Sequence, residues 1–117
     1  MLLLVDAETA AIRMADGDSP RLQVASTSDT AALNFFNKKS GLATALTSKS
    51  DTGNTLELFD SRGQIRVGLG VNERLFTALS VFGGNGKLGT RLGTQGNTGV
   101  TKLSFHDASG KMASTLP

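Results

Sequence analysis

The glycine-rich stretch of residues 82–89, FGGNGKLG, is the first candidate for chemistry, because glycine loops that end in lysine bind phosphate in many nucleotide-binding proteins. Such a loop needs Ser or Thr after the lysine and then a helix whose N-terminus meets the phosphate. Here Leu88 follows Lys87, and the sequence continues with the alternation of a strand. We therefore predict a tight turn between two strands.

His106 is the only histidine and the only side chain whose ordinary titration range suits a general base at neutral pH. Asp107 follows it directly, but adjacent residues in a strand point to opposite faces, which would separate the imidazole from the carboxylate. The chain has no cysteine, and no serine, histidine and acid arrangement or recurring carboxylate pair is evident. We expect no enzymatic activity and no cofactor.

Acidic residues at predicted turns are the candidates for a metal site. Residues 16–19, DGDS, come nearest to a calcium loop, which needs three or more oxygen ligands at close spacing. Asp60 and Asp107 stand alone in later turns, where an aspartate commonly accepts hydrogen bonds from the turn backbone. Turn formation accounts for each aspartate, so we predict no metal site.

A column of rings is the remaining candidate for ligand binding. Each member stands just before a predicted turn, and the members are Phe36, Phe59, Phe82 and His106. Rings in register can stack on sugars or bases. In the alternative interpretation, connecting segments or a neighbouring chain cover the column, because monomers seldom expose apolar stripes. Both interpretations stay open at this point.

The elements that position these residues are found in residues 56–70, LELFDSRGQIRVGLG, which predict a hairpin with its turn at residues 60–63. Aspartate opens such a turn by accepting hydrogen bonds from its own backbone, and glycine closes it because it tolerates a positive φ. The predicted cross-strand pairs are Phe59–Gln64, Leu58–Ile65, Glu57–Arg66 and Leu56–Val67.

The same frame fits the chain five times. The predicted hairpins cover residues 11–26, 32–47, 55–70, 78–93 and 102–117. On the face that carries Leu58, the predicted pairs nearest to the turns are Met14–Leu22, Phe35–Leu42, Leu58–Ile65, Val81–Leu88 and Phe105–Met112. Further apolar positions on the same face are Leu33, Leu56, Val67, Leu69, Leu79, Leu92 and Leu103. A one-residue slip would turn every side chain to the opposite face, so this agreement defines one apolar face for a core or an oligomer interface.

Residues 56–70 resemble a tandem repeat of bacterial and phage-associated proteins of unassigned function, with the pattern L-x-L-F-D-x-x-G-x-x-R-x-x-L-G. The likeness is fullest in the third copy and looser in the others. In the fourth copy, Gly83 and Gly89 stand where the pattern has aspartate and arginine. The resemblance implies a stacked array of β-hairpins, fibre-like and trimeric. It implies no catalytic residues.

The sequence thus predicts a single all-β domain over residues 1–117, built as a prism or solenoid-like stack of five tandem hairpins that oligomerisation completes. The alternative is a closed up-and-down barrel of about ten strands. The one helical element allowed for is a short turn over residues 72–76. Residues 47–54, 70–77 and 93–101 are rich in Gly, Thr, Asn and Ser, and are predicted as connecting loops.

Composition narrows the function classes. The net charge is +2 and the cations are scattered, which argues against a nucleic-acid partner. No stretch approaches the roughly 18 apolar residues of a membrane helix, and no signal peptide is seen, so we expect a soluble protein with no membrane partner and an undetermined compartment. The predicted function is a non-catalytic structural or interaction module that self-associates, most simply as a trimer in a fibre or appendage. The alternative is a β protein that binds a small ligand or a carbohydrate.

Overall fold

The computed structural model describes residues 2–5, 10–39, 41–71, 77–95 and 98–117. These residues are all-β, as predicted, and contain eleven strands. The strands are β1 (Leu2–Val5), β2 (Ala10–Asp16), β3 (Ser19–Ser26), β4 (Thr30–Asn37), β5 (Gly41–Lys49), β6 (Gly53–Phe59), β7 (Ile65–Val71), β8 (Thr77–Phe82), β9 (Leu88–Gln95), β10 (Val100–His106) and β11 (Met112–Leu116). No helix that could span a membrane occurs among the described residues. The helical turn allowed for at residues 72–76 lies outside them.

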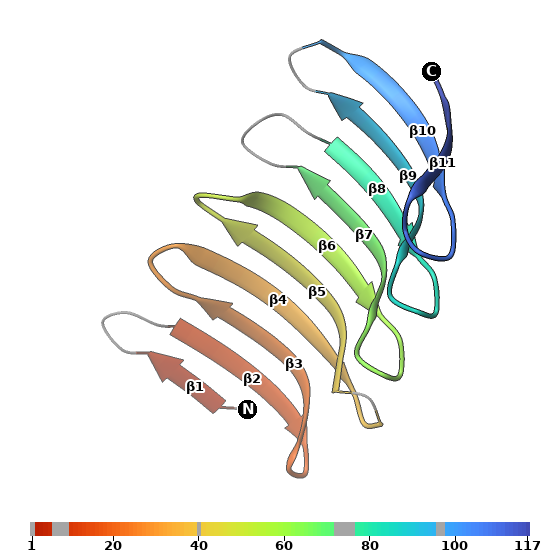
Figure 1. Cartoon of the computed structure of the whole chain (residues 1–117). Helices are drawn as coiled ribbons and strands as arrows, with labels where there is room; N and C mark the ends of the chain where they lie inside the picture. The colour runs from red at the N-terminus through yellow and green to blue at the C-terminus, as the bar shows by residue number, and fades with distance from the viewer. Residues whose placement is uncertain (1, 6–9, 40, 72–76, 96–97) are drawn as a thin grey trace.

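All eleven strands form one antiparallel sheet in the order of the sequence (Figure 1). β1 and β11 lie at opposite edges, so the sheet is open and a single chain does not form the predicted alternative of a closed barrel. The principal extents are 48 × 33 × 15 Å, which are the dimensions of a single curved layer. Because all eleven described strands belong to this one sheet, the described chain forms no second layer.

In the second to fifth hairpins, the turn holds one residue more than expected. Between β6 and β7, the Asp60 N–H donates to the Gln64 carbonyl at 2.9 Å, and the Gly63 N–H donates to the Asp60 carbonyl at 3.0 Å. Gly63 has a φ of 75°, the left-handed conformation that favours glycine. The same pair of bonds closes the turns at residues 83–87 and 107–111. The glycine-rich stretch is therefore a hairpin turn, as predicted.

In the second to fifth hairpins, the predicted pairing is wrong by one residue beside the turn and by two residues beyond it. Phe59 pairs with Ile65 and Leu58 with Val67, with a bulge between the two pairs. The turn shifts the pairing by one residue and the bulge shifts it by one more. Because a shift of two residues restores the strand alternation, the part of the second strand beyond the bulge keeps its predicted face. The residue next to the turn changes face instead, and this applies to Leu42, Ile65, Leu88 and Met112. In the first hairpin, Met14 pairs with Leu22 as predicted.

We call the side of the sheet that carries Leu56 and Leu58 the aliphatic face. Its central row has an aliphatic residue on every strand from β2 to β11: Ile12, Val24, Leu33, Leu46, Leu56, Leu69, Leu79, Leu92, Leu103 and Leu116. The next row towards the turns is Met14, Leu22, Phe35, Thr44, Leu58, Val67, Val81, Thr90, Phe105 and Ser114.

The opposite side, which we call the mixed face, carries polar, small and aromatic residues. Its central row is Arg13, Gln23, Asn34, Ala45, Glu57, Gly68, Ser80, Arg91, Ser104 and Thr115. Ala45, 5% exposed, is the one buried hydrophobic residue among those described, and no large side chain there is fully buried. The sheet therefore has no core of its own between two layers.

The strands extend further into the Gly, Ser and Thr segments than predicted. Thr47 pairs with Thr55, and Thr94 pairs with Thr101, within regions expected to be loops. β-branched threonine suits a pleated strand, and the Thr94 and Thr101 hydroxyls lie 2.8 Å apart across the ladder. The loop prediction was therefore too wide at both ends of each segment.

Candidate functional site

The aliphatic face leaves most of its large side chains open to solvent. All the large hydrophobic residues with high exposure lie on this face, except Val100 and Met112. On the aliphatic face, Leu46 is 50% exposed and Leu116 is 54% exposed. Soluble monomers seldom expose a contiguous apolar surface of this length. The predicted apolar face is thus present as a surface, with the four residues next to the turns removed from it.

Charge is distributed unequally between the two faces. The central row of the aliphatic face and the row beside it contain no Asp, Glu, Lys or Arg. The mixed face places Arg13, Glu57 and Arg91 in its central row, with Lys102 two residues from that row on β10. An uncharged apolar surface suits close contact with another apolar surface, whereas a charged one suits polar ligands or solvent.

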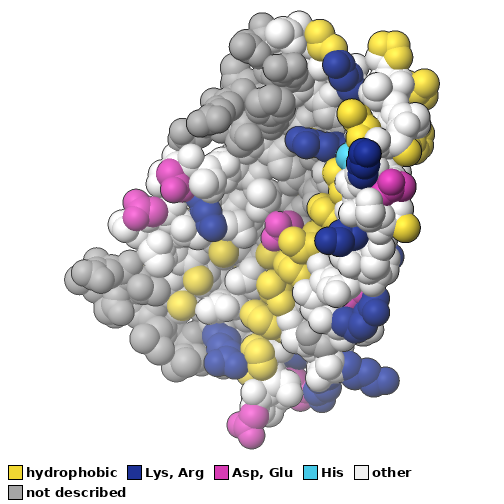
Figure 2. Space-filling model, viewed as in Figure 1, with side chains coloured by type: hydrophobic (Ala, Val, Ile, Leu, Met, Phe, Trp, Pro, Cys, Tyr) yellow, Lys and Arg dark blue, Asp and Glu magenta, His cyan; other side chains and the backbone are white. Residues whose placement is uncertain are grey.

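The ring column lies on the mixed face as part of a band of apolar pairs. The pairs are Phe36–Leu42, Phe59–Ile65, Phe82–Leu88 and His106–Met112. The four rings stand on alternate strands, and neighbouring strands are about 4.8 Å apart, so successive rings are about 10 Å apart with an aliphatic side chain between them. Figure 2 shows this hydrophobic band beside the histidine. The rings are half-buried and do not form a continuous stack.

His106 is held by its own hairpin. Its Nδ1 lies 3.2 Å from the Gly110 carbonyl oxygen, so Nδ1 carries the proton, and its Nε2 lies 3.1 Å from the Ser104 hydroxyl. Asp107 accepts from the Ser109 hydroxyl at 2.6 Å and from the Ser109 and Lys111 N–H groups, and these bonds, the hydroxyl first, lower the pKa of Asp107. His106 ends β10 and Asp107 opens the turn, so the two side chains form separate hydrogen bonds.

A network that we call the turn ladder connects the third and fourth hairpins. Asp60 accepts hydrogen bonds from the N–H groups of Arg62 at 2.8 Å and Gln64 at 3.2 Å, which lower its pKa, with the Arg62 N–H as the main cause. The Arg62 guanidinium donates to the Gly84 carbonyl at 2.7 Å.

Arg66 is the central side chain of the turn ladder. Its Nε donates to the Phe82 carbonyl at 3.0 Å, and its Nη1 reaches Asp60 at 3.4 Å. The predicted Glu57–Arg66 pair is therefore wrong, because Glu57 pairs with Gly68 across the strands. In the next step of the ladder, the Asn85 amide donates to the Ala108 carbonyl at 2.8 Å.

No group of three or more His, Cys, Asp or Glu side chains that could hold a metal ion occurs in the part of the chain that the structure describes. In the first turn, the Asp16 carboxylate forms an ion pair with Lys38 at 2.6 Å instead. Both side chains are mostly exposed, so this pair contributes little to stability.

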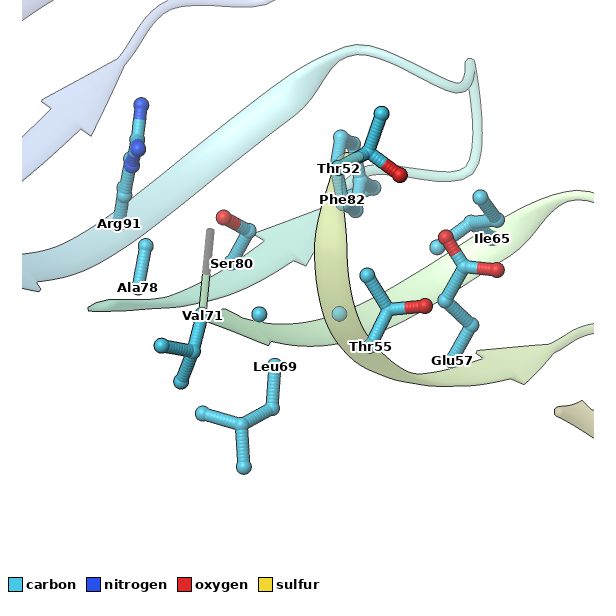
Figure 3. A pocket seen from close by; sticks show the side chains of 12 residues that line it. Thr52, Thr55, Glu57, Ile65, Leu69, Val71, Ala78, Ser80, Phe82 and Arg91 are labelled. Atoms are coloured by element: carbon cyan, nitrogen blue, oxygen red, sulfur yellow. The ribbon is translucent and has the colours of Figure 1, made fainter. Parts of the chain in front are cut away.

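A hollow of about 270 Å³ opens on the mixed face over strands β6 to β9. Its lining residues are Thr52, Thr55, Glu57, Ile65, Gly68, Leu69, Gly70, Val71, Ala78, Ser80, Phe82 and Arg91. Figure 3 shows Glu57 and Arg91 on opposite sides with Ser80 between them, while Leu69 and Val71 point away to the aliphatic face. Of the predicted ring column, Phe82 is the one member that lines this hollow.

Comparison with known proteins bears on the fold. No family model and no curated protein matches the chain. Two crystal structures of TarM are similar to it, one a Staphylococcus aureus mutant in complex with Fondaparinux, alpha-GlcNAc-glycerol and UDP (TM-score 0.53) and the other TarM itself (TM-score 0.52). Each is 8% identical over 84% of this chain. The chain spans 22% and 21% of those chains, so the likeness concerns one part of them and shows the fold alone.

Proposed function

We propose that this chain is a non-catalytic structural module that assembles with copies of itself through the aliphatic face. The observation that carries the proposal is the uninterrupted aliphatic row on ten successive strands, with side chains such as Leu46 half exposed in a sheet that has no second layer. An apolar sheet surface of this kind is stabilised when it packs on another apolar surface.

The energy available from association is substantial. Burying the exposed half of one leucine contributes about 1 kcal/mol, and the central row offers many such side chains. The face of the sheet, with extents of 48 × 33 Å, exceeds the roughly 800 Å² that each partner buries in an interface of standard size. The absence of charge from its two central rows removes the main cost of burying it.

We favour three copies. The resemblance of residues 56–70 to a repeat implies a trimeric array, and an open sheet supplies one wall of a three-sided prism whose interior is formed by the aliphatic faces. A module of this shape serves in a fibre, a stalk or a surface appendage.

The test is the absolute mass in solution, measured by light scattering on a sizing column over a dilution series. We expect a persistent multiple of 12.1 kDa, and three in particular. The double variant Leu56→Thr/Leu69→Thr replaces two apolar side chains with β-branched threonine, which suits a strand, and should shift the mass towards one chain. The matched control is Thr55→Ser/Ser80→Thr on the mixed face, which should leave the mass unchanged. A wild-type monomer at every concentration would overturn the proposal.

A second candidate function is the binding of a small ligand or a carbohydrate on the mixed face. The hollow beside Phe82 favours it, because an aromatic side chain and several polar groups converge there. Replacing Phe82 with Ser should weaken binding and leave the strand content unchanged, as judged by circular dichroism. Phe59→Ser, on the same face but outside the hollow, is the matched control, and equal effects of the two variants would argue against this function.

A further inference from the structure

We propose that the hollow over β6 to β9 binds a small dipolar ligand of the amino-acid or dipeptide class, with its cationic end at Glu57 and its anionic end at Arg91. This inference rests on the second candidate function and names the ligand class for that site. The hollow combines two opposite charges, an apolar wall and a floor that carries two glycines.

The two charged residues belong to one cross-strand row. Glu57 pairs with Gly68, Gly68 with Ser80 and Ser80 with Arg91. Three strand spacings therefore separate the backbone positions of Glu57 and Arg91. At about 4.8 Å per spacing their Cα atoms are about 14 Å apart. Charges that pair to stabilise a sheet stand on adjacent strands, so this separation does not serve a direct ion pair.

Neither charge is neutralised by a neighbour within the described parts of the chain. The hydrogen bonds of Arg66, the nearest cation expected for Glu57, go to Phe82 and Asp60. Arg91 forms no side-chain hydrogen bond or ion pair there, although its backbone carbonyl accepts a bond from Ser104. Glu57 is half-buried, and a half-buried carboxylate gains most from a ligand that supplies a charged donor.

The bottom of the hollow carries two glycines, Gly68 and Gly70, at positions where the fold would accommodate a side chain. A Cβ added at Gly68 would meet its nearest neighbour, Phe82, at 3.9 Å, and one added at Gly70 would meet Thr55 at 3.7 Å, which are ordinary contacts. Neither glycine has a positive φ. Glycine in a strand costs stability relative to residues with a side chain. Here Gly68 leaves space in the row between Glu57 and Arg91, and Gly70 leaves space in the neighbouring row, between Thr55 and Ala78.

The walls specify the middle of the ligand. Phe82 and Ile65 contribute apolar surface to the hollow, and Thr55 and Ser80 each contribute a hydroxyl group (Figure 3). A volume of about 270 Å³ accommodates a ligand of dipeptide size. A free amino group donates to the Glu57 carboxylate, a free carboxylate accepts two bonds from the Arg91 guanidinium, and an apolar side chain rests on Phe82.

The experiment is a titration of the intact chain with glycyl-phenylalanine, followed by amide chemical shifts. Three analogues serve as matched ligands: the N-acetylated, the C-amidated and the doubly blocked dipeptide. We expect the zwitterion to bind at least tenfold more tightly than the doubly blocked form. Glu57→Gln should weaken binding of the free amine but not of the N-acetylated form, and Arg91→Gln should weaken binding of the free carboxylate but not of the amide. Arg13→Gln, a charge loss in the same row outside the hollow, should change nothing.

The outcomes separate the ligand class from the site. Equal binding of all four dipeptides at the hollow, or tighter binding of a neutral disaccharide such as maltose, overturns the dipolar class and leaves the second candidate function standing. If neither the dipeptide nor the disaccharide shifts amide signals at the hollow at 50 mM, roughly fifty times a Kd of 1 mM, then both the dipolar ligand class and the second candidate function are overturned.

Discussion

The two faces of the same strands differ in what they present. The aliphatic face repeats one kind of residue on ten strands, whereas the mixed face changes from strand to strand and carries Arg13, Glu57 and Arg91 in its central row. Strand alternation makes the two faces independent in composition, because successive side chains point to opposite sides. A single-layer sheet can therefore use one side for assembly and keep the other for recognition.

The difference also indicates where stability originates. With Ala45 as the one buried hydrophobic residue among those described, the isolated sheet depends on its backbone ladder, the turn ladder and contacts made by the half-buried ring band. An isolated hairpin is marginal in water, and an open layer gains most of its missing hydrophobic stabilisation from a partner surface. Variants that affect one face and spare the other therefore test the comparison directly.

The largest effect is expected from a charge placed in the centre of the aliphatic face. Leu56→Asp would bury an unpaired carboxylate in the proposed interface, at a cost of about 3–5 kcal/mol, and should yield a dissociated or unfolded chain. Ser80→Asp places the same charge on the mixed face and should change the melting temperature by a few degrees at most. Light scattering and thermal unfolding of both variants provide the measurement. Equal behaviour of the two variants would contradict the division of roles between the faces.

The next effect is a dependence of stability on concentration. If folding and assembly are coupled in a trimer, each tenfold dilution should destabilise the chain by about 1 kcal/mol and lower its melting temperature by a few degrees. Scanning calorimetry over a hundredfold range of concentration tests this expectation. A melting temperature that stays constant would indicate that the aliphatic face adds nothing to stability through association.

The sequence could predict which face each residue occupies in the first strand of every hairpin, but not the full register of the strand pairs. Alternation in stretches such as residues 56–59 and turn residues such as Asp60 and Gly63 were sufficient to place the hairpins. The bulge between Leu58 and Phe59 left no comparable pattern, because it arises from backbone geometry. Ile65 consequently lies beside Phe59 on the mixed face.

The hollow was missed for the same reason. Its central row depends on Glu57 lying opposite Gly68, and the predicted register placed Arg66 there. The alternation of Gly68 and Gly70 with aliphatic residues in β7 was the available signal, since it marks a strand with one bare side. With the bulge included, the same alternation would have predicted a low floor on the mixed face.

A smaller effect is expected at the edge of the mixed face, where Arg66 connects two hairpins. Arg66→Ala removes the bond to the Phe82 carbonyl and the contact with Asp60, and should lower the free energy of unfolding by about 1 kcal/mol. Arg13→Ala removes an exposed arginine from the same face and should be nearly neutral. Urea unfolding at one fixed protein concentration compares the two variants. A loss as large for Arg13 as for Arg66 would show that net charge is responsible, and not the turn ladder.

The smallest effect concerns pH, and it comes from the turns. The pKa of Asp60 lies below its ordinary value near 3.8, chiefly because the Arg62 N–H donates to the carboxylate. A lowered folded-state pKa means that the ionised carboxylate contributes stability above the unfolded-state value and that this contribution is lost as the pH falls below about 4. Thermal unfolding between pH 7 and pH 2 should show a shallower acid slope in Asp60→Asn, which keeps the acceptor oxygen but carries no charge. Asp51→Asn, at an exposed aspartate with no hydrogen bond in the described chain, should retain the wild-type slope. Because this effect is confined to one turn, it should leave both the assembly mass and ligand binding at the hollow unchanged, and a change in either would mean that the turn ladder couples the two faces.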